Sequence, residues 1–164
     1  GPAGQASVMP VPPGHDTLLA DPNVPLVIVE GSKGILAAAS ALDGTSQPVA
    51  LIGLLGCWGW SSNNRATEDL MAIPASGRDV TVILDADMTS NRNVWDAASA
   101  LKEQLETVLG AASVKFARVP GRDKEGMDDL LSRVPQAGRE AVIRRVMANA
   151  KESLGRRPGK PGQQ

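Results

Sequence analysis

The 164-residue chain contains one cysteine, one histidine and no tyrosine, and these shortages exclude several kinds of site. The lone Cys57 rules out an intrachain disulfide and a zinc site built from several cysteines. With His15 as the sole histidine, His-rich metal clusters are excluded and a Ser-His-Asp triad is disfavoured. No apolar run approaches the roughly 20 residues that a membrane-spanning helix needs, so we expect no membrane partner. A metal site in this chain would therefore use oxygen ligands.

The remaining composition is that of one folded domain, with 42% hydrophobic and 21% charged residues. The net charge of −1 hides an asymmetry along the chain. Residues 139–164 carry seven basic and two acidic side chains, which leaves the preceding part with a net charge of −6. Two interpretations of this basic segment remain open: it contacts nucleic-acid phosphates, or it is a solvated helix and a linker to a neighbouring domain.

The amino-acid composition changes along the chain and indicates several segments. Residues 1–23 are rich in proline, glycine and alanine, which predicts a flexible lead-in. Its first residues, Gly1-Pro2-Ala3-Gly4, are typical of a protease-cleavage scar, so we expect a fragment of a larger protein. They lack the pattern of a signal peptide, and we expect a cytoplasmic location. We predict a folded domain over 24–134, a C-terminal helix over 135–154 and a disordered basic tail over 155–164.

Four short runs rich in β-branched residues predict buried strands over 26–29, 49–52, 79–84 and 114–119. Segments with apolar residues at helical spacing lie between and after them. We predict helices over 33–42, about 67–73, about 91–109, 128–133 and 139–154. Strands that alternate with helices indicate an α/β fold: a roughly four-stranded, mainly parallel sheet flanked by helices.

Acidic residues follow two of these strands. Glu30 comes after the first strand, and Asp85 and Asp87 come after the third. Sites in open α/β sheets form at the carboxyl ends of the strands, so these side chains are expected to converge there. Three carboxylates without histidine or cysteine favour Mg²⁺ or Mn²⁺. The alternative is that each acid caps the next helix or lies on the surface, although glutamate is a poor helix cap.

The segments around these acids resemble the two signatures of the Toprim domain, a fold shared by topoisomerases, bacterial-type primases, nucleases and recombination proteins. The first is Leu26-Val27-Ile28-Val29-Glu30-Gly31, and the second is Val82-Ile83-Leu84-Asp85-Ala86-Asp87. The resemblance covers about residues 24–134 and is closest to the Toprim-like domains of plasmid and phage replication proteins. Those domains also have a stretch like Gly56-Cys57-Trp58-Gly59-Trp60 and a late Lys-x-Gly-x-Asp-Asp-Leu-Leu, here Lys124 to Leu131.

This resemblance implies a Rossmann-type sandwich and phosphodiester chemistry on nucleic acid. Glu30 would be a metal ligand or general acid/base, and Asp85 and Asp87 would be Mg²⁺ ligands. We therefore expect the Mg²⁺-binding domain of a primase-type nucleotidyltransferase in DNA replication. Its partners would be nucleotides, DNA (including single strands) and the other domains of a larger replication protein. Two alternatives stay open: a Toprim metal-dependent nuclease, and a non-catalytic module that binds nucleic acid or a partner.

Several further residues are candidates for binding rather than catalysis. Lys33, Arg92 and Lys124 could contact phosphate groups, although each could also be an ordinary surface cation. Asp128 and Asp129 could complete the acidic site or could cap the helix that follows. Trp58 and Trp60 could stack on the bases of a single strand or could fill space in the core or at a domain interface.

Overall fold

The computed structural model describes residues 8–62 and 65–160. The expected cleavage scar lies outside these residues. The elements follow one another in this order: α1 (His15–Ala20), β1 (Leu26–Glu30), α2 (Ser32–Leu42), β2 (Ala50–Leu54), β3 (Ser61–Ser62), β4 (Arg65–Ala66), α3 (Glu68–Met71), β5 (Asp79–Leu84), η1 (Ala86–Thr89), α4 (Arg92–Glu103), η2 (Gln104–Val108), β6 (Ser113–Arg118), α5 (Met127–Ser132), η3 (Gln136–Gly138) and α6 (Arg139–Ala148).

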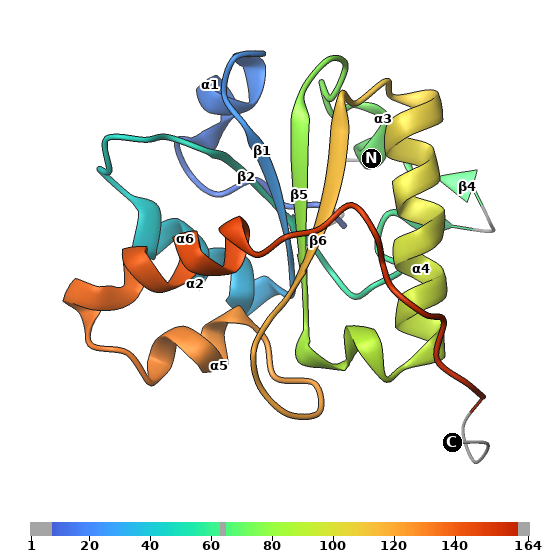
Figure 1. Cartoon of the computed structure of the whole chain (residues 1–164). Helices are drawn as coiled ribbons and strands as arrows, with labels where there is room; N and C mark the ends of the chain where they lie inside the picture. The colour runs from blue at the N-terminus through green and yellow to red at the C-terminus, as the bar shows by residue number, and fades with distance from the viewer. Residues whose placement is uncertain (1–7, 63–64, 161–164) are drawn as a thin grey trace.

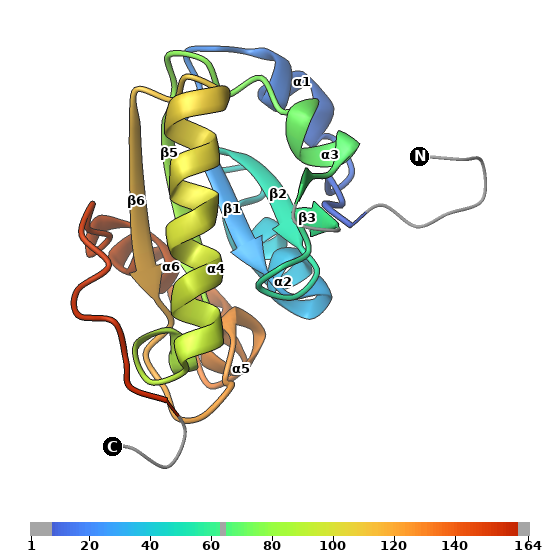
Figure 2. The same ribbon diagram turned by 90° about the vertical axis from the view of Figure 1, so that its right-hand side faces the viewer.

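The four main strands form one parallel sheet with the order β2-β1-β5-β6, which confirms the predicted α/β fold. The two central strands are almost wholly buried, as expected for apolar runs that have helices on both faces. Helices α2, α5 and α6 lie on one face, and α4 covers the other (Figures 1 and 2). The carboxyl ends of β1 and β5 therefore lie side by side, where β1 leads into α2 and β5 into η1.

The core is divided by the sheet into two layers. On the α4 face, Ile28 and Val82 contact a cluster that includes Leu101. On the opposite face, Val29 belongs to a cluster with Ile35 of α2 and with residues of α5 and α6. Burial on both faces of the same strands fixes their register and holds their carboxyl ends in place.

The amino-terminal segment differs from the flexible lead-in expected through residue 23. The N–H groups of Gly53 and Leu55 donate to the carbonyls of Pro10 and Val8 at 2.7 and 3.1 Å, along the outer edge of β2. Helix α1 follows, and Met9 is buried. These residues are ordered because they satisfy the free backbone groups of an edge strand, a role that composition does not reveal.

The carboxyl-terminal segment also differs from the prediction. Helix α6 ends at Ala148 and not near Leu154. Lys151 instead forms a two-hydrogen-bond bridge with Phe116 on the edge of β6, with N–H···O distances of 2.8 and 3.0 Å. Residues 149–157 then cross β6 toward α4 (Figure 1), and Arg157 of the predicted tail pairs with Asp96 at 2.8 Å. Within the described residues, no helix has the length and apolar character needed to cross a membrane.

Candidate metal and nucleic-acid site

Glu30 is the last residue of β1, and the chain turns at once through Gly31 (φ 92°) into α2. Its Oε1 accepts a hydrogen bond from the Asp85 N–H at 2.9 Å, which links the carboxyl ends of the two central strands. The Glu30 side chain is half-buried, and burial raises the pKa of its carboxyl group. The nearby negative charge of Asp87 acts in the same direction, whereas the Asp85 N–H and Lys124 oppose it.

Asp85 follows β5 directly and begins the turn of η1. Burial raises the pKa of its carboxyl group to about 7, and the charges of Glu30 and Asp87 add to the shift, followed by Asp128 and Asp129. A pKa this high means that the surroundings of Asp85 do not contain enough positive charge to stabilise the ionised carboxylate. It is the most strongly perturbed acid of the cluster, which we call the acidic site: Glu30, Asp85, Asp87, Asp128 and Asp129.

Asp87 joins the acidic site from a turn and not from a strand, because the chain enters the 3₁₀ turn η1 at Ala86. Asp87 is 9% exposed, and its Oδ2 accepts a hydrogen bond from the Asn91 side-chain amide at 3.2 Å. Its charge still acts on both Glu30 and Asp85. Asn91, which also caps α4, is thus a positioning residue for Asp87.

Helix α5 brings in the remaining acids. A cavity of about 220 Å³ is lined by Glu30 and Asp85 on one side and by Asp128 and Asp129 on the other. Gly126 allows this approach: a Cβ atom there would lie 2.8 Å from Asp85 Oδ1 and 3.2 Å from Asp128 Oδ1. Asp129 also accepts the Gly126 N–H at 2.8 Å, so its predicted capping role is present as well. The need for glycine at 126 was not visible in the sequence.

Two of the three predicted phosphate ligands lie at this cavity. Lys33, in the first turn of α2, and Lys124 both line it. Over residues 8–62 and 65–160, neither lysine lies within ion-pair distance of a carboxylate. Arg92 does not line the cavity; it is the first residue of α4, where its charge acts on Asp96.

The two tryptophans differ. Trp60 is 4% exposed and belongs to the core, so its ring is not available to a base. Trp58 is 37% exposed, and its indole N–H donates to Asn93 Oδ1 at 2.9 Å, which fixes the ring. The adjacent Cys57 lies close enough for the charges of Glu30 and Asp87 to raise its thiol pKa, after burial as the main cause. Trp58 therefore stands on a loop beside the acidic site.

The carboxylates of the acidic site lie near one another, but they do not form a complete coordination shell for a metal ion. Within the described residues, no three side chains of His, Cys, Asp or Glu are grouped closely enough to hold a metal ion. The acids interact through their charges, and in the described residues none of the five takes part in an ion pair. Such an arrangement of unpaired carboxylates attracts cations.

A family model described as a domain of unknown function, DUF3854, matches residues 15–137. The chain belongs to the DUF3854 family. No curated protein sequence matches it. Among solved structures, it is similar to a DnaG primase catalytic domain bound to single-stranded DNA, with 22% identity and a TM-score of 0.52. It is also similar to the E. coli primase catalytic core, with 21% identity and a TM-score of 0.50.

These alignments cover 84% and 83% of this chain but only 38% and 37% of the primase chains. The chain thus spans less than two-fifths of the proteins it resembles. At these identities the likeness establishes the fold: the DUF3854 chain has a primase-like α/β fold. It assigns neither a ligand nor a reaction to the acidic site.

Proposed function

We propose that this chain is the Mg²⁺-binding Toprim domain of a primase-type DNA replication protein, and that it serves phosphodiester bond formation on nucleic acid. The observation that carries the proposal is the acidic site, where the pKa of Asp85 is raised to about 7 at the carboxyl ends of adjacent parallel strands. The Toprim resemblance and the primase-like fold support it. One structural neighbour is a primase domain bound to single-stranded DNA, which favours nucleic acid as the partner.

The donor set fits Mg²⁺ or Mn²⁺. Its oxygen ligands are those of hard cations, and Mg²⁺ commonly binds through one or two carboxylates while it keeps several waters. The absence of a compact three-ligand cluster in the described residues is compatible with that mode. We assign Glu30, Asp85 and Asp87 as the residues that would hold the ion, directly or through its bound waters, with Asp128 and Asp129 as secondary acids. When bound, the ion would neutralise charge on a reacting phosphate.

The other residues of the site would bind and orient the nucleic acid. Lys33 and Lys124 line the same cavity and would contact phosphate oxygens. Trp58, held by Asn93 beside the acids, offers a ring face on which an unpaired base can stack. We keep Arg92 as a more distant phosphate contact. Glu30 would accept or return a proton, since its pKa is raised and its Oε1 is anchored on the Asp85 N–H.

Metal binding can be tested without any catalytic activity. Addition of Mg²⁺ or Mn²⁺ to the EDTA-treated protein should raise its melting temperature, because an ion that binds only the folded state stabilises it. The double substitution Asp85→Asn with Asp87→Asn should abolish this rise. Asp16→Asn, which removes an exposed carboxylate from α1, is the matched control and should leave the rise intact. Equal shifts in wild type and double variant would overturn the metal assignment.

The reaction requires a separate assay with nucleoside triphosphates, Mn²⁺ and both single-stranded and supercoiled DNA. Incorporation of nucleotides that depends on Asp85 supports the primase-type function. Nicking of the supercoiled DNA with the same dependence would instead assign the site to a nuclease. DNA binding that persists in the Asp85/Asp87 variant, with neither activity, would favour the non-catalytic module.

A further inference from the structure

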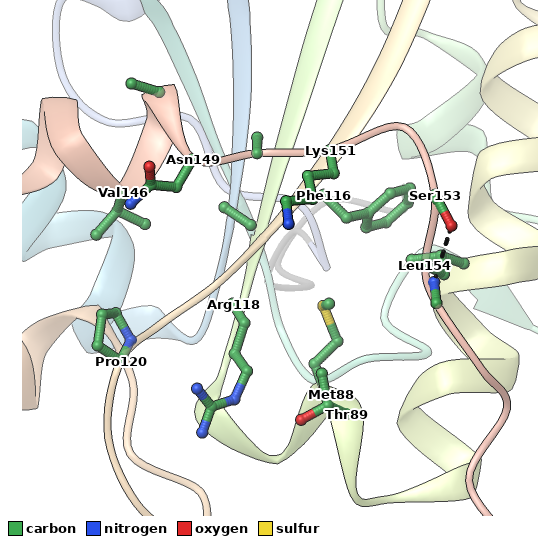
Figure 3. Close-up of a pocket in the computed structure, with 14 residues that line it drawn as sticks. Met88, Thr89, Phe116, Arg118, Pro120, Val146, Asn149, Lys151, Ser153 and Leu154 are labelled. Atoms are coloured by element: carbon green, nitrogen blue, oxygen red, sulfur yellow. Dashed lines mark hydrogen bonds between the residues drawn. The ribbon is translucent and has the colours of Figure 1, made fainter.

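A second and larger cavity, of about 590 Å³, lies at the open edge of the sheet. Its walls come from β6, from η1, from the end of α6 and from the segment 149–155 that crosses β6 (Figure 3). The residues that matter here are Met88, Thr89, Phe116, Arg118, Lys151 and Leu154. None of the five residues of the acidic site lines it, although Met88 and Thr89 follow Asp87 directly in η1. The edge pocket is our name for this cavity.

The charges that line the edge pocket have one sign. Among the described residues, Arg118 and Lys151 are the only charged ones that line it, and no carboxylate of these residues does. Arg118 donates from Nε to the Ala86 carbonyl at 2.6 Å and from Nη2 to the Gly121 carbonyl at 3.0 Å. Both acceptors are neutral, and across the described residues neither Arg118 nor Lys151 forms an ion pair. Two cations without a partner of opposite charge make the pocket suited to an anion.

The walls that carry these cations are held in place. The backbone of Lys151 pairs with Phe116 through two hydrogen bonds, and the indole N–H of Trp95 donates to the Leu154 carbonyl at 3.3 Å. The guanidinium of Arg118 is oriented by its two carbonyl acceptors. A ligand that uses these groups would therefore find them largely preorganised, which lowers the entropy cost of binding.

The pocket also offers apolar surface next to the cations. Phe116, Met88 and Val146 line it but are only 3%, 6% and 5% exposed, so the accessible apolar surface comes from the half-buried Ala150 and Leu154. Figure 3 shows Lys151 above and Met88 and Arg118 below Phe116, so charged and apolar groups share one space. A ligand that matches it has an anionic group beside a flat, weakly polar one.

We infer that the edge pocket binds a nucleotide, with its phosphate at the cationic side chains Arg118 and Lys151 and its base or sugar on the apolar surface of Ala150 and Leu154. A volume of about 590 Å³ falls within the range typical of small-molecule sites. The choice of a nucleotide over another amphipathic anion rests on the proposed function; the preference for an anion rests on the pocket alone. The nucleotide is either free or one unit of a single strand that continues past the acidic site.

The test is an NMR titration of the ¹⁵N-labelled chain in EDTA, so that metal binding at the acidic site plays no part. The probes are AMP, inorganic phosphate and an eight-residue oligothymidylate. AMP should shift the amide signals of Thr89, Arg118 and Lys151 with saturation. Phosphate should bind at least tenfold more weakly than AMP, because it lacks the group that contacts the apolar surface.

Arg118→Gln and Lys151→Gln should each weaken AMP binding about tenfold, the loss that follows from removing a hydrogen bond to a charged group. Lys115→Gln is the matched control: it removes an exposed cation from the same strand, outside the pocket, and should change nothing. Lys151→Gln also keeps the backbone bridge to Phe116, so its loss of affinity would not reflect a loosened segment.

Two comparisons complete the design. An oligothymidylate that shifts the same amides more tightly than AMP identifies a strand as the source of the nucleotide, and binding of AMP alone identifies free nucleotide. Absence of shifts at these amides with both probes would overturn the inference, as would phosphate binding as tightly as AMP or Lys115→Gln weakening binding equally. Because the titration contains EDTA and the metal assay contains no nucleotide, either proposal can fail without the other.

Discussion

The two ends of strand β5 place a charged side chain in opposite electrostatic surroundings. At its amino end, just before the strand, Arg78 is 2% exposed, and its guanidinium donates to the carbonyls of Leu18, Leu19, Val24 and Pro74. At its carboxyl end, Asp85 lies among four other acids, and burial, together with their negative charges, raises the pKa of its carboxyl group to about 7. The first charge is enclosed by acceptors, whereas the second is surrounded by charges of its own sign.

Under the proposed function, this difference separates an end of the sheet that serves stability from an end that binds a ligand. Arg78 joins α1, the start of β1 and the segment before β5 into one unit, so it stabilises the amino end of the sheet. The acidic end gains nothing in stability from its like charges, and a ligand of opposite charge, as proposed above, would relieve their repulsion. Substitutions at the two ends should therefore have opposite effects on the free energy of unfolding.

The largest effect is expected at the amino end. Arg78→Met should lower the free energy of unfolding by about 3 kcal/mol, because it leaves buried carbonyl groups without donors. Urea unfolding at pH 7.5 measures this loss, with the exposed Arg156→Gln as control. Arg78→Lys keeps the positive charge but lacks the planar guanidinium group. Its free energy of unfolding should therefore lie between those of Arg78→Met and the Arg156→Gln control. A loss below 1 kcal/mol for Arg78→Met would contradict the stabilising role of this end.

The next largest effect is expected for Gly126→Ala, which should weaken metal binding. Its Cβ atom would meet the oxygens of Asp85 and Asp128 at 2.8 and 3.2 Å and force the two carboxylates apart. We expect about a tenfold loss in Mg²⁺ affinity, the lower end of what displaced supporting groups cost a metal site. Calorimetric titration measures it. Gly44→Ala, at an exposed turn with open space around it, should leave the affinity unchanged.

Asp85→Asn should stabilise the metal-free protein by about 1 kcal/mol at pH 8, since it removes repulsion at a half-exposed site. The pKa of Asp85 is raised from 3.8 to about 7 in the folded state. Its contribution to stability is therefore full below pH 3.8 and is lost as the pH rises through 7. The gain from the substitution should accordingly be present at pH 8 and shrink toward pH 5 in EDTA. A destabilised Asp85→Asn protein at pH 8 would contradict the proposed repulsion.

The smallest effect is expected at His15, on the outer edge of β2. Its Nδ1 accepts the Leu51 N–H at 3.1 Å, and burial lowers the pKa of the imidazole below 6.5. The contribution of the neutral imidazole to the free energy of unfolding is full above pH 6.5. It is lost as the pH falls below this value, because the ring then protonates. His15→Gln should remove the small decrease in the free energy of unfolding that His15 causes between pH 7 and pH 5. The Asp85→Asn background is used, since Asp85 titrates oppositely, and an unchanged pH dependence would exclude His15 as its source.

The central part of the fold was predictable because it obeys local rules. The runs ending at Glu30 and Leu84 are apolar and β-branched, and both form buried parallel strands. The edges were not predictable in this way. Residues 8–10 and Lys151 are ordered by hydrogen bonds to β2 and β6, and those partners are distant in the sequence. A segment that completes a sheet edge needs no apolar periodicity of its own.

The residues that form the acidic site were easier to predict from the sequence than their arrangement in space. Glu30 and Asp85 follow strands, so topology alone brings them together. The approach of Asp128 depends on Gly126, and the position of Asp87 depends on the 3₁₀ turn and on Asn91. Arg78 and the edge pocket gave no signal at all, because their partners come from several separate segments.

The measurement that tests the central claim most directly is paramagnetic broadening by Mn²⁺, which falls off steeply with distance and compares both ends of β5 in one spectrum. Substoichiometric Mn²⁺ added to the ¹⁵N-labelled protein should first broaden the amide signals of Gly31, Ala86 and Gly126. Those of Val24 and Arg78 should remain sharp. The Asp85/Asp87 double variant should show no such selectivity. Broadening that is equal at the two ends of the strand, or unchanged in the double variant, would contradict a metal site at the carboxyl end of this sheet.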